Sequence, residues 1–184
     1  LDYDALKLKT NERGEANMHG LLDEAPHTLR SIHTNATHLM LATGQAAQTP
    51  YVCYVPYVWH EDAYCVWIAD VTEPIRHLRL AQAASVMLLE HGHGQQSTQL
   101  IWIVEASEVA YQSPEYRELL QQMCLHSNVD LQAALSAECQ AIYRLKPIKG
   151  RLITDLNEII ALIATDLHEA MAITQQKTLA IANV

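Results

Sequence analysis

The stretch from His38 to Glu90 decides the fold: it reads HLMLAT over 38–43, PYVCYVPYVW over 50–59, AYCVWIAD over 63–70, a helix pattern over 74–83 and ASVMLLE over 84–90. Apolar and aromatic residues fill the four short runs, and polar segments separate them, which is typical of β-strands. The pattern therefore predicts strand, strand, strand, helix, strand. Three successive strands with short connections predict an antiparallel meander.

The composition limits the classes to which this chain can belong. Its 184 residues suit one domain, and 49% hydrophobic residues suffice for a core although Phe is absent. A formal net charge of −9 argues against nucleic acid or an anionic membrane as partner, because both attract a surplus of Lys and Arg. No run of about 18 apolar residues exists, so we expect no membrane span. We expect a cytoplasmic protein with reduced thiols.

The rest of the chain predicts further strands and several helices. Strand patterns cover 98–106, 141–147 and 151–154, and helix patterns cover 26–34, a segment beginning at Ser113, 130–140 and 155–171. About six antiparallel strands predict a mainly β fold, a small barrel with helical additions. We expect residues 1–25 to form an N-terminal arm, 26–154 the barrel domain, and 155–184 a C-terminal helix and tail of the same domain.

Two local features refine this expectation. Pro56 cannot donate a ladder hydrogen bond, which places its strand at an edge or a bulge of the sheet. A corner centred on Glu61 and Asp62 would pair the second strand with the third. Cys53 would then lie opposite Asp70 rather than Cys65, so we expect no disulfide between these two cysteines.

Five segments together resemble the FMN-binding split-barrel proteins related to pyridoxamine 5′-phosphate oxidase. The segments are Leu39–Thr43, Pro50–Tyr57, Ile75–Arg79, Ser85–Glu90 and Tyr143–Pro147. The nearest branch of that family is the one that uses and degrades haem. The resemblance covers residues 26–150 and implies a six-stranded antiparallel split barrel. It also implies a homodimer that holds a flavin or a haem in the cleft between its subunits.

The resemblance implies a set of cofactor-binding residues: Tyr54, Val55, Pro56, Ala69, Thr72, Arg76, His77 and Trp102. Thr72 and Arg76 would hold the FMN phosphate, since hydroxyl and guanidinium groups make strong hydrogen bonds to it. Glu73 and Pro74 act against a phosphate, because the first repels it and the second has no N–H. Each residue also has a structural interpretation: Thr72 caps a helix, Arg76 pairs with Glu73, and Trp102 packs in a core.

The histidines raise the question of haem or a metal. His168 lies where the haem-degrading relatives place an axial ligand, so the resemblance implies it as a candidate. His91 and His93 could share a metal in an extended loop, but the sequence places no third ligand there and favours an exposed polar loop. We therefore expect no dedicated metal site.

Three functions remain open for this chain. It can be an FMN-dependent oxidoreductase in which the flavin carries the hydride. The sequence identifies neither its catalytic residues nor its substrate. It can instead bind or degrade haem in the same cleft, or form a structural dimer without a cofactor. Thr72, Arg76 and Tyr54 favour the first function, whereas Glu73 and Pro74 favour the loss of FMN binding.

Overall fold

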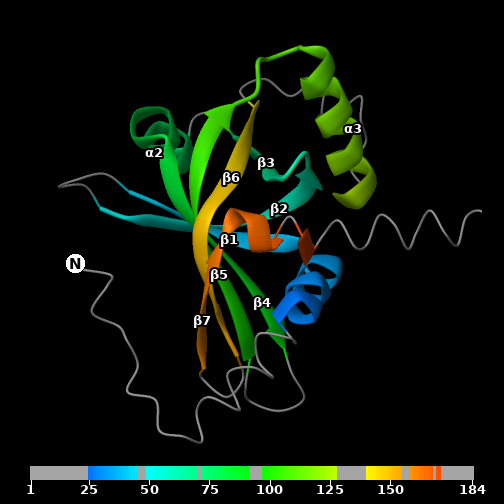
Figure 1. The fold of residues 1–184 in the computed structure, drawn as a ribbon. Coiled ribbons are helices and arrows are strands. Elements are labelled where there is room, and N and C mark those ends of the chain that lie inside the picture. The colour runs from blue at the N-terminus through cyan, green and yellow to red at the C-terminus, as the bar shows by residue number, and fades with distance from the viewer. Residues whose placement is uncertain are drawn as a thin grey trace, which may run out of the picture.

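The computed structural model describes residues 25–44, 49–69, 72–91, 97–127, 140–154, 158–167 and 169–170. A helix over residues 25–35 opens the described part, and a helical turn over 164–167 lies near its end. Between them come β1 (His38–Thr43), β2 (Tyr51–His60), β3 (Ala63–Ala69), α2 (Glu73–Ala81), β4 (Ala83–His91), β5 (Ser97–Glu108), α3 (Pro114–Ser127), β6 (Gln140–Ile153) and β7 (Ile159–Ile163) (Figure 1).

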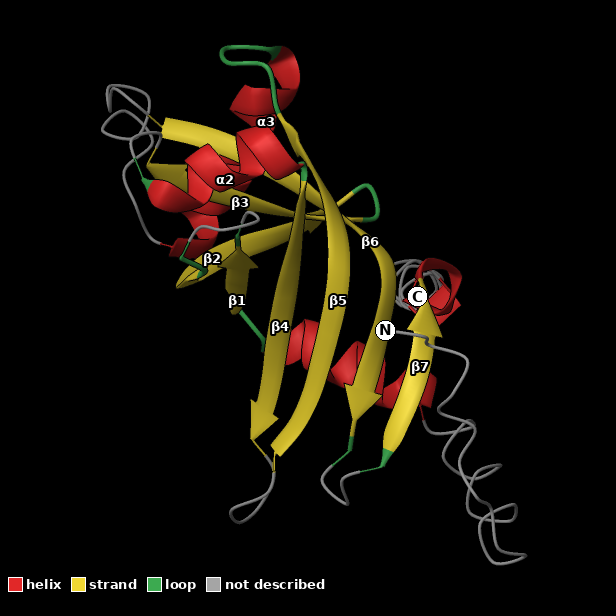
Figure 2. Ribbon diagram, turned by 90° about the vertical axis from the view of Figure 1, so that its left-hand side faces the viewer, coloured by secondary structure: helices red, strands yellow, loops and turns green. Residues whose placement is uncertain are grey.

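The strands form one antiparallel sheet that closes on itself. Their order is β3-β2-β1-β4-β5-β6-β7, and β3 also pairs with β6 from Tyr64 opposite Leu145 to Ala69 opposite Gln140. This pairing closes a six-stranded barrel, and β7 adds a further strand along the other end of β6 (Figure 2). The predicted mainly β, six-stranded antiparallel split barrel with helical additions is confirmed.

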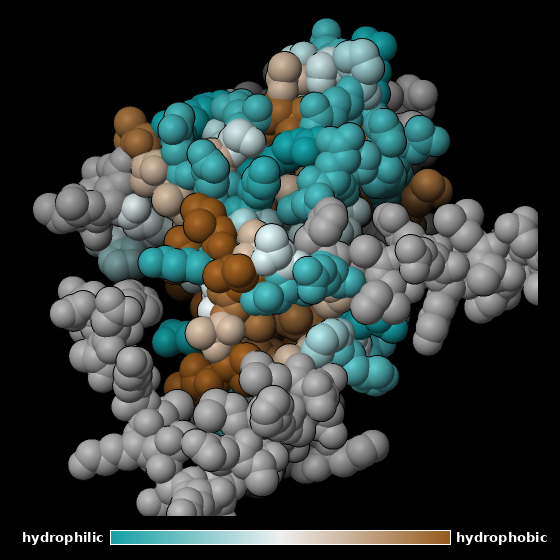
Figure 3. All heavy atoms as spheres, in the orientation of Figure 1, coloured by the Kyte–Doolittle hydropathy of each residue, from teal (hydrophilic) through white to brown (hydrophobic). Residues whose placement is uncertain are grey.

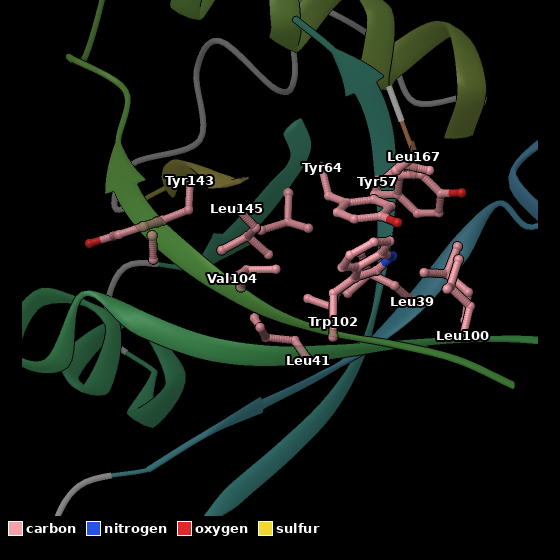
Figure 4. Close-up of a cluster of buried hydrophobic side chains, with 14 of the residues drawn as sticks. Leu39, Leu41, Tyr57, Tyr64, Leu100, Trp102, Val104, Tyr143, Leu145 and Leu167 are labelled. Atoms are coloured by element: carbon pink, nitrogen blue, oxygen red, sulfur yellow. The ribbon is translucent and has the colours of Figure 1, made fainter. Parts of the chain in front are cut away.

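Large apolar and aromatic side chains fill the interior of the barrel. Figure 4 shows one group of them meeting in the core: Leu39, Leu41, Tyr57, Tyr64, Leu100, Trp102, Val104, Tyr143, Leu145 and Leu167. Successive residues of a strand point to opposite sides, so alternate residues reach this core. Burying a large apolar side chain contributes roughly 1.5–3 kcal/mol. The aromatic residues supply the volume that Phe would provide elsewhere.

Helix α3 covers one outer side of the barrel, against β2 and β3. A second core cluster lies beneath it, formed by Val58, Cys65, Val109, Tyr116, Leu119, Leu120, Met123, Cys124 and Ile142. Arg144 on β6 fastens this side, because its guanidinium donates to Glu115 of α3 and, at 2.8 Å, to Glu61 of the β2–β3 turn. Among the described residues, no helix has the length and apolarity needed to cross a membrane.

The two ends of the barrel are closed by different helices. Helix α2 lies where β1 ends, and the ring of its His77 shares a 3.2 Å hydrogen bond with Thr43. The helix over 25–35 lies at the other end, where Ser31 donates to Glu90 of β4 at 2.6 Å. Leu29 and Ile32 of this helix belong to the same core cluster as the strands. The barrel therefore offers no open mouth at the described ends.

The β2–β3 hairpin and Pro56 follow their predictions. Glu61 and Asp62 form a two-residue turn with φ values of 44° and 61°, the left-handed geometry that suits a tight hairpin. The N–H of Tyr57 donates to Thr37 on the β1 side, so the nitrogen of Pro56 points to the opposite side. There β3 pairs with β2 only from Tyr57 onward, so Pro56 faces a free edge of the strand.

Two expectations about the C-terminal half are wrong. The predicted strands over 141–147 and 151–154 are one strand, β6, with a register shift near Ile103 on its partner β5. The predicted helix over 155–171 is replaced at Ile159–Ile163 by β7, because β-branched isoleucines pair well along the free edge of β6. The helix predicted over 130–140 lies outside the described residues.

Gly150 allows β6 to run without interruption past Trp102. A Cβ atom at this position would lie 2.5 Å from Ile101 O and 2.5 Å from Cε3 of Trp102. We expect Gly150→Ala to lower the free energy of unfolding by about 1–3 kcal/mol, because the buried indole cannot yield. Urea unfolding followed by fluorescence measures this. Gly44→Ala is the matched control, since its Cβ would lie 3.7 Å from the nearest atom, and an equal loss in both variants would contradict this explanation.

His33 anchors the helix over 25–35 inside the barrel. Its Nε2 shares a 2.8 Å hydrogen bond with the Tyr64 hydroxyl, and its ring packs edge-on against Trp59. Its Nδ1 is buried without a hydrogen-bond partner among the described residues. Burial disfavours the charged ring and lowers the pKa of His33 from 6.5 to about 4.

This pKa predicts a loss of stability in mild acid. Below pH 6.5 the unfolded chain takes up a proton at this histidine, whereas folded His33 does so only near pH 4. The unfolded state therefore binds more protons in that interval, and we expect His33 to cost about 2 kcal/mol between pH 7.5 and pH 5. Urea unfolding at both pH values, compared with His33→Gln, isolates this contribution. An identical pH dependence in the two proteins would contradict it.

Candidate functional site

The structure divides the expected cofactor-binding residues into two groups. Tyr54, Val55 and Pro56 lie on β2, and the residues of the second group, Ala69, Thr72, Arg76 and His77, lie at the end of β3 and on α2. The eighth residue, Trp102, is fully buried in the barrel. Only those of these side chains that face solvent can contact a ligand.

Three of the expected side chains point inward. Trp102 has an exposed fraction of 0% and belongs to the core cluster. Val55 faces Leu39 across the β1–β2 ladder and packs on the same core. His77 is buried and bonded to Thr43. Their environments agree with the packing interpretation, and in the single chain they are screened from a ligand on the surface.

The polar side chains at the start of α2 bond to groups of the same segment. The hydroxyl of Thr72 donates to Ala69 O at 2.8 Å, and it makes no capping hydrogen bond to the helix. Arg76 Nη1 lies 3.1 Å from Glu73 Oε1, and both side chains are exposed. An exposed pair of this kind contributes at most about 1 kcal/mol, so a stronger anion can displace the carboxylate. The Glu73 carboxylate is the local obstacle to a phosphate.

Helix α2 is held rigidly against the barrel at its other end. Two 3.2 Å hydrogen bonds join Arg79 to the carboxylate of Glu108, and the Tyr143 hydroxyl donates to the same carboxylate at 2.9 Å. The Arg79 hydrogen bond holds the pKa of Glu108 below its usual value, and burial raises the pKa of Tyr143 to about 12. This cluster positions the helix, and it remains charged over the physiological pH range.

The outer face is the surface formed by outward side chains of β1, β2, β4, β5, β6 and β7. It carries Met40, Ala42, Val52, Tyr54, Met87, Leu89, Ile101, Ile103, Ile153, Ile159, Ala161 and Ile163. One row crosses six strands in register: Tyr54, Met40, Met87, Ile101, Arg151, Ala161. Tyr54 is 70% exposed and Val52 61%. Figure 3 shows apolar side chains gathered over β5, β6 and β7.

One end of the outer face carries a stacked aromatic pair. The rings of His38 and Tyr54 lie 4.9 Å apart with an angle of 17° between their planes. The Nδ1 atom of His38 shares a 3.0 Å hydrogen bond with the Thr37 hydroxyl, and none of the described residues bonds its Nε2. With Nδ1 protonated, Nε2 carries a free lone pair, as in histidines that ligate metals.

A separate small hollow lies beside the helical turn over 164–167. It has a volume of about 150 Å³ and is lined by Trp59, Asp62, Lys146, Pro147, Ala164, Thr165 and Leu167. It includes none of the expected cofactor-binding residues. The volume is small for a flavin or a haem, since pockets for ligands of that size usually hold roughly 300–1,000 Å³.

Several histidines predicted as possible ligands are not described. His168 and His93 lie outside the described residues, and the side chain of His91 is not described either. Within the described ranges, no group of three or more His, Cys, Asp or Glu side chains could hold a metal ion. What sequence reasoning missed is the outer face itself, with His38, Lys149 and Arg151. The alternation of Ile159, Ala161 and Ile163 was its visible signal.

The fold is shared with solved structures of known proteins. The chain is similar to HutZ, a haem storage protein from Vibrio cholerae, with 23% identity over 70% of this chain and 92% of that one, at a TM-score of 0.61. It is also similar to a haem-binding protein from Mycobacterium smegmatis, with 15% identity over 78% of this chain and 59% of that one, at a TM-score of 0.64.

A flavoprotein appears among the same structural neighbours. An FAD-binding protein from Mesorhizobium loti is 16% identical over 67% of this chain and 90% of that one, with a TM-score of 0.55. No family model and no curated protein matches the sequence. At these identities the likeness establishes the fold: this chain is a split barrel of the kind found in haem-binding and flavin-binding proteins.

The pair at the start of α2 can be tested directly. If this end of α2 holds the FMN phosphate, Glu73→Gln should tighten FMN binding several-fold, because it removes the carboxylate that competes for Arg76. Arg76→Ala should weaken it by a similar factor. Equilibrium dialysis against FMN and against riboflavin, which lacks the phosphate, separates this contact from binding of the ring. Equal affinities for FMN in all three proteins would remove Arg76 and Glu73 from the site.

Proposed function

We propose that two copies of this chain pair through the outer face and bind haem at the seam between them. The observation that carries this proposal is the row of outward side chains across six strands, which is apolar except at Arg151 and has the His38–Tyr54 pair at one end. Contiguous apolar surface of this extent usually marks a contact with another molecule. Twofold pairing would remove it from water in both copies at once.

A second copy is the partner that the charges favour. The chain is strongly acidic overall, with a formal net charge of −9, yet the outward side chains of β5 and β6 include three cations, Lys146, Lys149 and Arg151, beside one carboxylate, Glu105. The outer face is largely apolar, and most of the described acidic side chains lie elsewhere on the surface. Two acidic chains can therefore approach through their outer faces without strong repulsion. Cys53, Cys65 and Cys124 form no disulfide, as is usual in the reducing cytoplasm, where we place this dimer.

The side chains at this surface fit a haem. A porphyrin is flat and apolar, and Tyr54, Met40 and Met87 offer aromatic and polarisable contacts of matching character. His38 presents an oriented imidazole whose Nε2 is free among the described residues. Bound haem would supply iron chemistry, and the chain would orient the ring and exclude water from it. Similar folds in proteins that store or bind haem support this proposal.

Flavin binding is a second candidate with its own observation. Thr72 and Arg76 lie at the start of α2, where the helix dipole favours an anion, as an FMN phosphate would require. An FAD-binding protein shares the fold. A flavin-dependent oxidoreductase would require Arg76 to leave Glu73, whereas the haem proposal needs no rearrangement of α2. A dimer without cofactor remains as the third outcome of the test below.

Spectra separate the three functions. Purified protein titrated with haemin should develop a shifted Soret band at one haem per seam, whereas titration with FMN should leave the flavin spectrum unchanged. A flavin-bound spectrum without haemin binding would support the oxidoreductase instead. Binding of neither, with a dimer in solution, would support a structural role.

Pairing and haem binding should fail together when the outer face is charged. Ile159→Glu places a carboxylate of each copy in the seam, opposite Ile153 and away from the cations of β6, which costs several kcal/mol on association. We expect a monomer in sedimentation velocity and a loss of haemin affinity of at least about 100-fold. Leu125→Glu, at an apolar position on α3 that is 77% exposed, is the control and should remain a dimer. A wild-type protein that is monomeric in sedimentation velocity would contradict the proposal.

A further inference from the structure

Two cations interrupt the outer face on β6, the strand next to its β7 edge. Lys149 and Arg151 both point outward from β6, two residues apart. Lys149 lies between Ile103 on β5 and Ile163 on β7, and Arg151 lies between Ile101 and Ala161. Each positive charge therefore has an apolar side chain on both neighbouring strands.

Arg151 differs from most arginines of the described chain in having no acceptor. Arg30, Arg76, Arg79 and Arg144 each donate to a carbonyl or a carboxylate. None of the described residues forms a hydrogen bond or an ion pair with the Arg151 side chain. Arg117 on α3 is equally without a partner, but it lies exposed on a helix outside the outer face.

Pairing through the outer face changes the situation of Arg151. A guanidinium that is taken out of water without a counter-charge costs several kcal/mol, so the seam must supply an anion. The outward side chains of the described strands offer Glu105, two residues beyond Ile103 on β5, but Lys146 of β6 lies directly opposite it. Glu105 therefore faces a cation of its own chain across the ladder, and Arg151 is left without a carboxylate among the outward side chains of the described strands. The seam therefore favours a ligand that is apolar in its body and anionic at its rim.

We propose that Arg151, with Lys149 beside it, binds the carboxylate groups of the haem at this seam. The inference rests on the proposed function, and it assigns the preference for a ligand with carboxylate groups to these two residues. Haem combines a flat apolar ring with two carboxylate arms on one edge. A planar guanidinium can bind a carboxylate through two parallel hydrogen bonds, and the apolar neighbours of Arg151 keep competing water away.

A chemical change in the ligand tests this contact directly. Haemin and its dimethyl ester share the ring and the iron, but the ester has no charged carboxylate. We expect Arg151→Met to weaken haemin binding about tenfold or more, and to change binding of the ester by less than about twofold. Methionine retains the apolar stem, so pairing of the copies should persist. Arg151→Lys should restore part of the lost affinity, and Arg117→Met should change neither ligand.

The measurements are Soret titrations of the dimer with each ligand, and sedimentation velocity of each variant. Equal weakening of haemin and ester by Arg151→Met would overturn the inference, as would no weakening of either. If Arg151→Met and Glu105→Gln both weaken pairing and leave the preference for haemin over its ester intact, Glu105 of the second copy is the counter-charge, and the inference fails. A wild-type dimer that binds neither ligand would refute the proposed haem binding itself.

Discussion

The pairing of β3 with β6 is the constraint on which the rest of this structure depends. It joins strands that are more than seventy residues apart in the sequence and turns an open meander into a closed barrel. Strand β6 meets β3 along its first half, β5 along its length and β7 along its second half. In a closed barrel, each strand residue points either into the core or to the outer surface. Only the residues of the outer surface are then available to contact another molecule.

Closure also packs large side chains into the interior of the barrel. The core cluster fills the barrel, and α2 and the helix over 25–35 lie at its two ends. Helix α3 covers one outer side with a core of its own. The outer face remains as an apolar surface of the single chain that solvent can reach. The split barrels that bind haem or flavin share this architecture.

Much of the fold could be predicted from the sequence, and each wrong prediction has a physical cause. Residues 155–171 carry apolar side chains at spacings that satisfy a helix, yet Ile159–Ile163 also alternates as a strand. Only the free edge of β6 decides between the two. Among the expected site residues, Val55, His77 and Trp102 point inward because the barrel closes around them. Tyr54, Thr72 and Arg76 remain at the surface, where a ligand can reach them.

The sequence by itself determined strands β1 to β5, their order along the chain, the Glu61–Asp62 turn and the position of Pro56 at an edge or a bulge of the sheet. These features follow from local periodicity and backbone geometry, which neighbouring residues specify. The tertiary structure alone decided that Tyr54, Met40, Met87, Ile101 and Arg151 share one row, because these residues come from five strands. Cross-strand register is a long-range property, and it places an unpaired guanidinium within an apolar surface.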